Sequence, residues 1–208
     1  MKKLTTTISG NNTDLDPVNT FVKIDQLEGK EVVRVTKDPK VHAVDEPTFA
    51  KLIGSDFKDG IIEVTVLSKL LENAPDFARG FIGVAFRIDE SNSKFEGIYI
   101  RPTNGRADDQ LRRNRSTQYF SYPDFKFDRL RNEFTGMYES YADMGLNEWI
   151  KIKIEVKGKK AKLYLNGNSQ PVFVVNDLKH GADGSGGIGL WVDVGTNGYF
   201  TDLQVEND

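Results

Sequence analysis

The sequence predicts an all-β protein, a two-sheet antiparallel jelly-roll sandwich. Short segments rich in β-branched and aromatic residues recur along the chain, with turn-forming residues between them. Helical periodicity is almost absent, which removes the main competing fold classes. Ten or more strands at this spacing suit one sandwich domain over residues 1–208, because sandwiches of this length often have a single core.

Each expected strand lies between turn residues. Residues 21–27 and 31–36 flank a Glu-Gly-Lys turn and are expected to pair as a hairpin, and residues 49–54 form a further candidate strand. The remaining strands are expected at GIIEVTVL (60–67), GFIGVAFRID (80–89), FEGIYIR (95–101), WIKIKIEV (149–156), AKLYLNG (161–167), PVFVV (171–175), GIGLWVDV (187–194) and YFTDLQV (199–205). The one long connection, from about residue 102 to residue 147, is expected to be functional or to contain short elements of its own.

Composition limits the classes of function. The chain has a net charge of −3 and a pI of about 5.5, which disfavours a general attraction to nucleic acid. It has no run of about 18 apolar residues, so no membrane partner is expected, and no cysteine, which excludes disulfides. The N-terminal MKKLTTTISGNNTD lacks the apolar core of a secretory signal. A cytoplasmic location is therefore expected if residue 1 is the native start.

Alternation along the strands predicts which side chains face outward. In FEGIYIR, Ile98 and Ile100 are expected to point between the sheets, which turns Tyr99 and Arg101 outward. If the strands around them are neighbours, small residues such as Gly97 leave room above the backbone for a ligand. That outward face would carry Glu63, Arg87, Tyr99 and Arg101. The alternative is an ordinary solvated face of an antiparallel sheet.

Two groups of segments resemble a known superfamily. WIKIKIEVKGKKAKLYLNGNSQPVFVV, followed by GGIGLWVDVGTNGYFTDLQV, resembles the closing strands of the concanavalin A-like lectin/glucanase superfamily, in its laminin-G-like and family-16-hydrolase-like branch. RGFIGVAFRI with FEGIYIRPTNGRADDQ resembles more closely the bacterial 3-keto-disaccharide hydrolase-like domains, and the matches together cover about residues 60 to 205. The resemblance implies a jelly roll whose concave sheet and loops meet carbohydrate.

Departures from that superfamily leave catalysis open. Family-16 hydrolases carry an E-x-D-x-x-E strand that supplies the two carboxylates of a retaining mechanism, and no such segment occurs here. The Arg, Gln-x-His and Tyr set of jelly-roll alginate lyases is also absent. The two histidines, His42 and His180, have no zinc-site spacing and are expected to be surface or turn residues.

Arginine is concentrated between Arg101 and Arg131. Seven of the ten arginines lie there, interleaved with aromatic residues and only four aspartates. Aromatic rings can stack on sugars, and guanidinium groups form bidentate hydrogen bonds to carboxylates or neighbouring oxygens. Binding to single-stranded nucleic acid is disfavoured because the aspartates interrupt the basic run. Two hypotheses remain: a carbohydrate site, with an anionic sugar as one option, and a scaffold in which Asp108 and Asp109 pair with Arg112 and Arg113.

These patterns define the candidate site residues. If the protein is an enzyme, the candidates for acid or base catalysis are Asp108, Asp109, Glu133 and Glu139. The candidates for substrate binding are Glu63, Arg87, Tyr99, Arg101, Gln110, Arg112, Arg113, Tyr119 and Tyr138.

No cofactor and no catalytic metal are expected. The resemblance allows a structural calcium near the termini, to which Asp14, Asp16 and Asp202 can contribute oxygens. The chain contains no twelve-residue calcium-binding loop.

Overall fold

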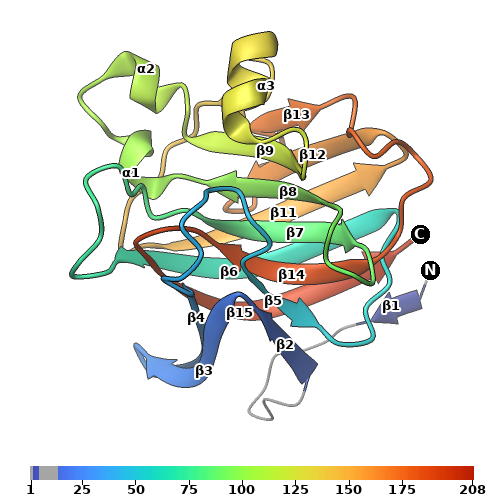
Figure 1. Cartoon of the computed structure of the whole chain (residues 1–208), viewed down its shortest axis with the longest axis horizontal. Helices are drawn as coiled ribbons and strands as arrows, with labels where there is room; N and C mark the ends of the chain where they lie inside the picture. The colour runs from blue at the N-terminus through green and yellow to red at the C-terminus, as the bar shows by residue number, and fades with distance from the viewer. Residues whose placement is uncertain (1, 5–13) are drawn as a thin grey trace.

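The structure, a computed structural model, describes residues 2–4 and 14–208. It consists of two antiparallel sheets packed face to face, which confirms the predicted all-β jelly-roll sandwich (Figure 1). The prediction of a cytoplasmic location was based on the N-terminal segment 1–14, and most of that segment lies outside the described residues. Within the part of the chain that is described, no helix is long and apolar enough to cross a membrane.

The first sheet, called sheet A, has eight strands. In spatial order they are β13 (Phe173–Val175), β12 (Lys160–Leu165), β11 (Trp149–Lys157), β6 (Gly60–Leu70), β15 (Thr196–Asn207), β4 (Lys30–Lys37) and β3 (Thr20–Leu27), and β1 (Lys2–Leu4) also pairs with β15. β3 and β4 form the predicted hairpin. Its two-residue turn, Glu28 and Gly29, has φ angles of 53° and 76°, the left-handed backbone that suits a tight hairpin.

The second sheet, sheet B, positions the candidate site. Its seven strands are, in spatial order, β10 (Glu139–Ser140), β9 (Thr117–Tyr122), β8 (Phe95–Ile100), β7 (Ile82–Ile88), β14 (Gly187–Val192), β5 (Phe49–Leu52) and β2 (Leu15–Val18). Apolar side chains of both sheets meet between them: Ile62 and Val64 of β6 and Ile98 and Ile100 of β8 are at most 1% exposed. Alternation therefore predicted the inward faces of these strands.

The long connection after β8 contains short elements of its own, which was one of the two alternatives expected from its length. It contains α1 (Pro102–Gly105), α2 (Gln110–Arg113), the strand β9, α3 (Phe127–Glu133) and β10. β9 pairs along its whole length with β8, so the middle of the connection belongs to sheet B. In Figure 1, α3 lies above β9, and the connection between β4 and β5 passes in front of β7 and β14.

The outer face of sheet B is filled by aromatic rings. Tyr99 packs against Trp191 with ring centroids 4.7 Å apart, and Phe120 packs against both. A Cβ added at Gly97 would lie 2.2 Å from the Phe120 ring. The small residues therefore make room for these rings, which corrects the expectation that they leave a hollow for a ligand above the sheet.

Two residues expected on this outer face lie elsewhere. Glu63 belongs to β6 in sheet A and forms an ion pair with Lys151 at 2.7 Å. Arg87 has a φ of 54° at the end of β7, where the alternation ends, and its buried guanidinium donates to the carbonyl oxygens of Lys58, Gly158 and Gly181. Neither residue is beside Tyr99 and Arg101. Glu63 is in the other sheet, which alternation cannot assign, and Arg87 stands where the left-handed backbone breaks the alternation of β7.

Candidate functional site

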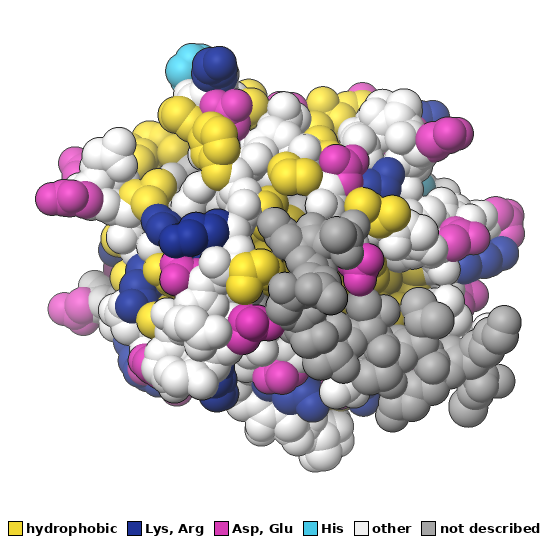
Figure 2. Space-filling model, turned by 90° about the horizontal axis from the view of Figure 1, so that it is seen from below, with side chains coloured by type: hydrophobic (Ala, Val, Ile, Leu, Met, Phe, Trp, Pro, Cys, Tyr) yellow, Lys and Arg dark blue, Asp and Glu magenta, His cyan; other side chains and the backbone are white. Residues whose placement is uncertain are grey.

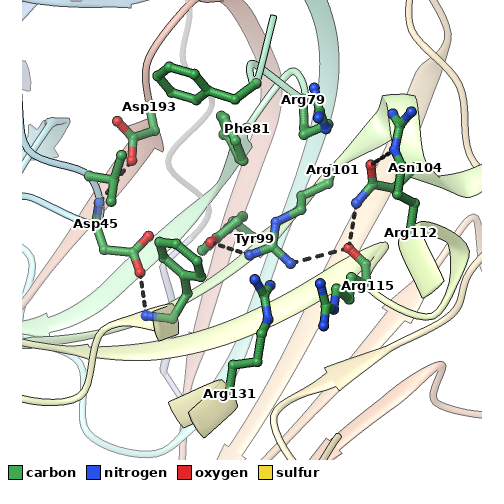
Figure 3. Close-up of a pocket in the computed structure, with 13 residues that line it drawn as sticks. Asp45, Arg79, Phe81, Tyr99, Arg101, Asn104, Arg112, Arg115, Arg131 and Asp193 are labelled. Carbon is green, nitrogen blue, oxygen red and sulfur yellow. Dashed lines mark hydrogen bonds between the residues drawn. The ribbon is translucent and has the colours of Figure 1, made fainter. Parts of the chain in front are cut away.

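The site residues meet in a pocket at the end of sheet B where β8 leads into α1. The pocket encloses about 260 Å³ and is called the arginine pocket here (Figure 3). Its walls come from the β4–β5, β6–β7 and β14–β15 connections, from β8, and from the three helices and the segments next to them. Its lining residues are Val44, Asp45, Phe77, Arg79, Phe81, Tyr99, Arg101, Asn104, Arg112, Arg115, Phe127, Arg131 and Asp193.

Arg101 is held rigidly at the base of this pocket. Its Nη2 donates to the hydroxyl oxygen of Tyr99 at 2.9 Å and to Oε1 of Gln118 at 3.0 Å. Its Nη1 donates to the carbonyl oxygen of Arg115 at 3.2 Å, as Figure 3 shows. The residue is 4% exposed. Tyr99 and Arg101, predicted to share one side of the sheet, thus lie together, and their hydrogen bonds fix the guanidinium plane.

Glu139 lies behind the pocket wall and binds three arginines. Its carboxylate is 3.1 Å from Nη1 of Arg101 and 3.6 Å from Nε of Arg115, and it also accepts from Nη2 and Nε of Arg131. Only 6% of its side chain is exposed. This candidate acid therefore stabilises the arginine cluster, and it links β10 to α3 and to the end of β8.

Two carboxyl groups that sequence reasoning missed line the opposite wall. Asp45 is fully buried; burial first, and then the neighbouring Asp193, raises its pKa to about 7. The Asp45 backbone N–H donates to Oδ2 of Asp193 at 2.8 Å, and Oδ2 of Asp45 accepts from the Phe127 N–H at 2.7 Å. Asp193 also pairs with buried Lys37 at 2.5 Å. Asp45 therefore caps the N-terminus of α3 from the β4–β5 connection.

An apolar wall completes the pocket. Phe77, in the β6–β7 connection, is 57% exposed, and Phe81, which also lines the pocket, is half-buried. Val44 and Phe127 add further apolar surface. An exposed phenyl ring at the rim of a pocket lined with hydrogen-bond donors provides a stacking surface next to polar contacts.

Those arginines of the 101–131 segment that form ion pairs do so with acids outside it. Arg106 pairs with Asp143 at 2.8 Å and also with Glu148. Asp109 caps α2 by accepting from the backbone N–H of Arg112 at 3.0 Å, instead of pairing with its side chain. Ion pairing does anchor this segment, but through acids later in the chain than predicted.

Several predicted site residues lie outside the pocket lining. Gln110 donates to Asn114, Arg113 donates to the Tyr141 hydroxyl, and Glu133 pairs with Arg129 on the surface of α3. Asp108 is exposed beside α2.

Two predicted tyrosines are buried on the other side of β9. The Tyr119 hydroxyl donates to Glu96 at 2.6 Å, and the Tyr138 hydroxyl donates to Asp177 at 2.6 Å. Of the predicted binding residues, the pocket therefore brings together Tyr99, Arg101 and Arg112.

A second pocket adjoins the first. It encloses about 400 Å³ and shares Arg115 and Arg131 with the arginine pocket. Glu139, Leu111 and Tyr141 are among its other lining residues. The shared arginines make the two pockets neighbouring compartments on one surface.

The described residues contain no group of three or more histidine or acidic side chains that could hold a metal ion. Asp14 directly precedes β2 of sheet B and Asp16 lies in that strand, whereas Asp202 lies in β15 of sheet A. The structural calcium stays a prediction.

Comparison with known proteins gives matches in structure alone. No family model matches the chain, and the search of curated proteins gave no match. A carbohydrate binding module, CBM66 from Bacillus subtilis, is similar over 93% of this chain and 96% of its own, with 14% identity and a TM-score of 0.60. The likeness is one of fold.

Two further solved structures have the same architecture. A putative glycosyl hydrolase from Parabacteroides distasonis is similar over 94% of this chain and 100% of its own, with 13% identity and a TM-score of 0.53. A Bacillus subtilis protein of unknown function with a galectin-like fold covers 91% of this chain and 87% of its own, with 13% identity and a TM-score of 0.51. These folds agree with the lectin/glucanase-like sandwich that the sequence resembles.

Proposed function

We propose that this protein binds carbohydrate in the arginine pocket. The observation that carries the proposal is the pairing of the exposed Phe77 ring with fixed hydrogen-bond donors across one small cavity. A sugar has an apolar ring face and a rim of hydroxyl groups, so it needs both kinds of surface at once. At about 260 Å³ the cavity is slightly smaller than the ~300–1,000 Å³ of typical drug-sized sites, which suits one sugar ring.

Similarity in fold supports this proposal. CBM66 is described as a carbohydrate binding module, and the Parabacteroides distasonis protein is described as a putative glycosyl hydrolase. Fold alone does not carry function, since one sandwich architecture serves many activities. The site residues give the independent argument, and the two agree on the same class of ligand.

The adjoining pocket extends the proposal to an oligosaccharide. Because Arg115 and Arg131 line both compartments, a chain whose end occupies the arginine pocket can continue across them toward Tyr141. Tyr141 is 42% exposed and Arg113 lies over its ring at 5.1 Å, so a second stacking surface is held in place there. The first compartment then selects a terminal residue and the second accepts the next one.

Hydrolysis is a second candidate function, in line with the sequence resemblance to 3-keto-disaccharide hydrolase-like domains. The observation that favours it is Asp45, whose raised pKa of about 7 keeps a proton available near neutral pH, as a general acid requires. Asp193 is a second carboxyl group beside it. In an enzyme, Asp45 is a better candidate than Asp108, Asp109 and Glu133, since those three lie outside the pocket lining.

A glycan array followed by product analysis tests both functions. Phe77→Ala should weaken binding of the glycan found on the array by about fivefold, since burial of part of a phenyl face contributes about 1 kcal/mol. Phe21→Ala is the matched control: Phe21 is 60% exposed and lies in β3 of sheet A. An array without any bound glycan, or equal losses in the two variants, would refute the binding proposal. Product formed by the wild type and lost in Asp45→Asn, with binding retained, would favour hydrolysis.

A further inference from the structure

The charges of the arginine pocket are unbalanced. Its wall contains two carboxyl groups and five guanidinium groups, those of Arg79, Arg101, Arg112, Arg115 and Arg131. On the face of the molecule seen in Figure 2, by contrast, basic and acidic side chains are interspersed. A concave site lined by one sign of charge concentrates ligands of the opposite sign.

The two carboxyl groups of the wall do little to neutralise these arginines. Asp193 forms its ion pair with Lys37, which lies in β4. Asp45 accepts from the Phe127 N–H, and its pKa of about 7 leaves it partly uncharged at neutral pH. Most of the compensation must therefore come from elsewhere.

Glu139, behind the wall, compensates part of the cluster. Its single carboxylate forms ion pairs with the three guanidinium groups of Arg101, Arg115 and Arg131. Of these, Arg101 is the most buried, and it also donates to neutral acceptors. Even where an acid is present, positive charge is in excess.

Arg79 and Arg112 make no ion pair within residues 14–208. Within the same residues, Arg79 makes hydrogen bonds through Nη1 alone, to the carbonyl oxygens of Asp76 and Ala78 at 2.6 and 2.8 Å. Arg112 makes long contacts, 3.3 Å to Oδ1 of Asn104 and 3.5 Å to Thr103. Both guanidinium groups therefore keep N–H donors for a ligand.

Neighbouring positive charges act on these side chains. Burial, followed by the charges of Arg112 and Arg101, lowers the pKa of Arg79. Burial, followed by the charge of Arg131, likewise lowers the pKa of Arg115. A bound anion would relieve this repulsion, because it favours the charged form of every arginine near it.

We propose that the sugar bound in the arginine pocket carries an anionic group, a carboxylate or a sulfate, held by Arg79 and Arg112. This inference rests on the proposed carbohydrate-binding function. A guanidinium presents two parallel N–H groups in a plane, which match a pair of anionic oxygens. Phe77 and Phe81 then contact the apolar face of the same sugar, so charge and stacking select one kind of residue.

Matched ligands test the charge requirement on the unmodified protein. Calorimetric titrations would compare an oligouronate, its methyl ester, a sulfated oligosaccharide and the corresponding neutral oligosaccharide. The uronate and its ester share the ring and the linkage but differ in charge. We expect at least one anionic ligand to bind tenfold or more tightly than its uncharged counterpart, and the tighter of uronate and sulfated sugar identifies the source of the anion.

Variants locate the effect within the pocket. Arg79→Gln and Arg112→Gln should each weaken binding of the anionic ligand about tenfold and change binding of its uncharged counterpart less than threefold. Arg129→Gln is the matched control, because it removes the same charge from an exposed ion pair on α3, outside the pocket lining. Thermal melts of the three variants identify any loss of folding.

The possible results separate the two proposals. If uncharged sugars bind as tightly as the anionic ones, the charge inference is wrong and carbohydrate binding stands. If the three variants lose affinity equally, the effect is one of overall charge and the assignment to Arg79 and Arg112 is wrong. If no sugar of either kind binds, both proposals fail together.

Discussion

Replacing Glu139 with glutamine tests how the arginine cluster is held together. This one carboxylate lies against Arg101, Arg115 and Arg131, and its side chain is 6% exposed. Glutamine keeps the shape and one acceptor oxygen but removes the charge. The variant therefore removes the acid that all three ion pairs share, and the three guanidinium groups stay close together without it.

The magnitude follows from the burial of each partner. Loss of one partner of a buried ion pair typically costs about 3–5 kcal/mol, because the other charge stays buried without compensation. The Arg101 side chain is 5% exposed but retains three neutral acceptors, on Tyr99, Gln118 and the backbone of Arg115. Arg131 and Arg115 are more exposed and each contribute at most about 1 kcal/mol. We expect the free energy of unfolding to fall by about 3 kcal/mol.

Urea unfolding followed by tryptophan fluorescence measures this loss, since Trp191 is buried in the aromatic layer of sheet B. Glu133→Gln is the matched control: it removes the acid of the exposed Arg129–Glu133 pair, one turn apart on α3, and should cost about 0.5 kcal/mol or less. The m-value should be the same for both variants. If Glu139→Gln destabilises the protein no more than Glu133→Gln does, the stabilising role assigned to Glu139 is wrong.

Two further predictions concern pH and packing. The pKa of the Asp45 carboxyl is about 7 in the folded state, against the usual 3.8. The stabilisation of the folded state by its protonated form is therefore complete below about pH 4 and is lost as the pH rises to 7. Asp45→Asn should abolish this loss, so variant and wild type should diverge by up to about 4 kcal/mol between pH 4 and 7 in urea titrations; parallel pH profiles would contradict the raised pKa. Gly97→Ala should lower stability by about 1–3 kcal/mol, since its Cβ would overlap the confined Phe120 ring. Gly184→Ala, whose Cβ would meet its nearest atom at 3.6 Å, should be nearly neutral, and equal melting temperatures for the two variants would contradict the packing argument.

Alternation predicted the strands well where one face is largely apolar. The inward faces of β6 and β8 were assigned correctly from Ile62, Val64, Ile98 and Ile100. β9 was missed because its inward face carries polar residues: Tyr119 is buried there, with its hydroxyl satisfied by Glu96 from the neighbouring strand. A buried polar residue paired by a partner distant in sequence does not produce the apolar period that marks a strand.

The pocket could be predicted only in part. Arg101 and Arg112 belong to a visible concentration of arginine, so composition pointed to them. Asp45, Phe77 and Asp193 each stand alone in separate connections, and only the packing of sheet B brings them to one cavity. One pocket residue did leave a signal in the sequence. Arg79 is an arginine shortly before β7, but it lies outside the arginine-rich segment 101–131 from which the site was predicted.

A two-dimensional proton–nitrogen NMR titration that follows the arginine Nε–H signals tests directly whether carbohydrate binds in the arginine pocket. The glycan identified on the array is added to the labelled protein, and signals are assigned with the arginine-to-glutamine variants. We expect saturable shifts for Arg79 and Arg112 and none for Arg129, which lies outside the pocket lining. Saturable binding that leaves the Arg79 and Arg112 signals unmoved would contradict the assignment of the carbohydrate site to the arginine pocket.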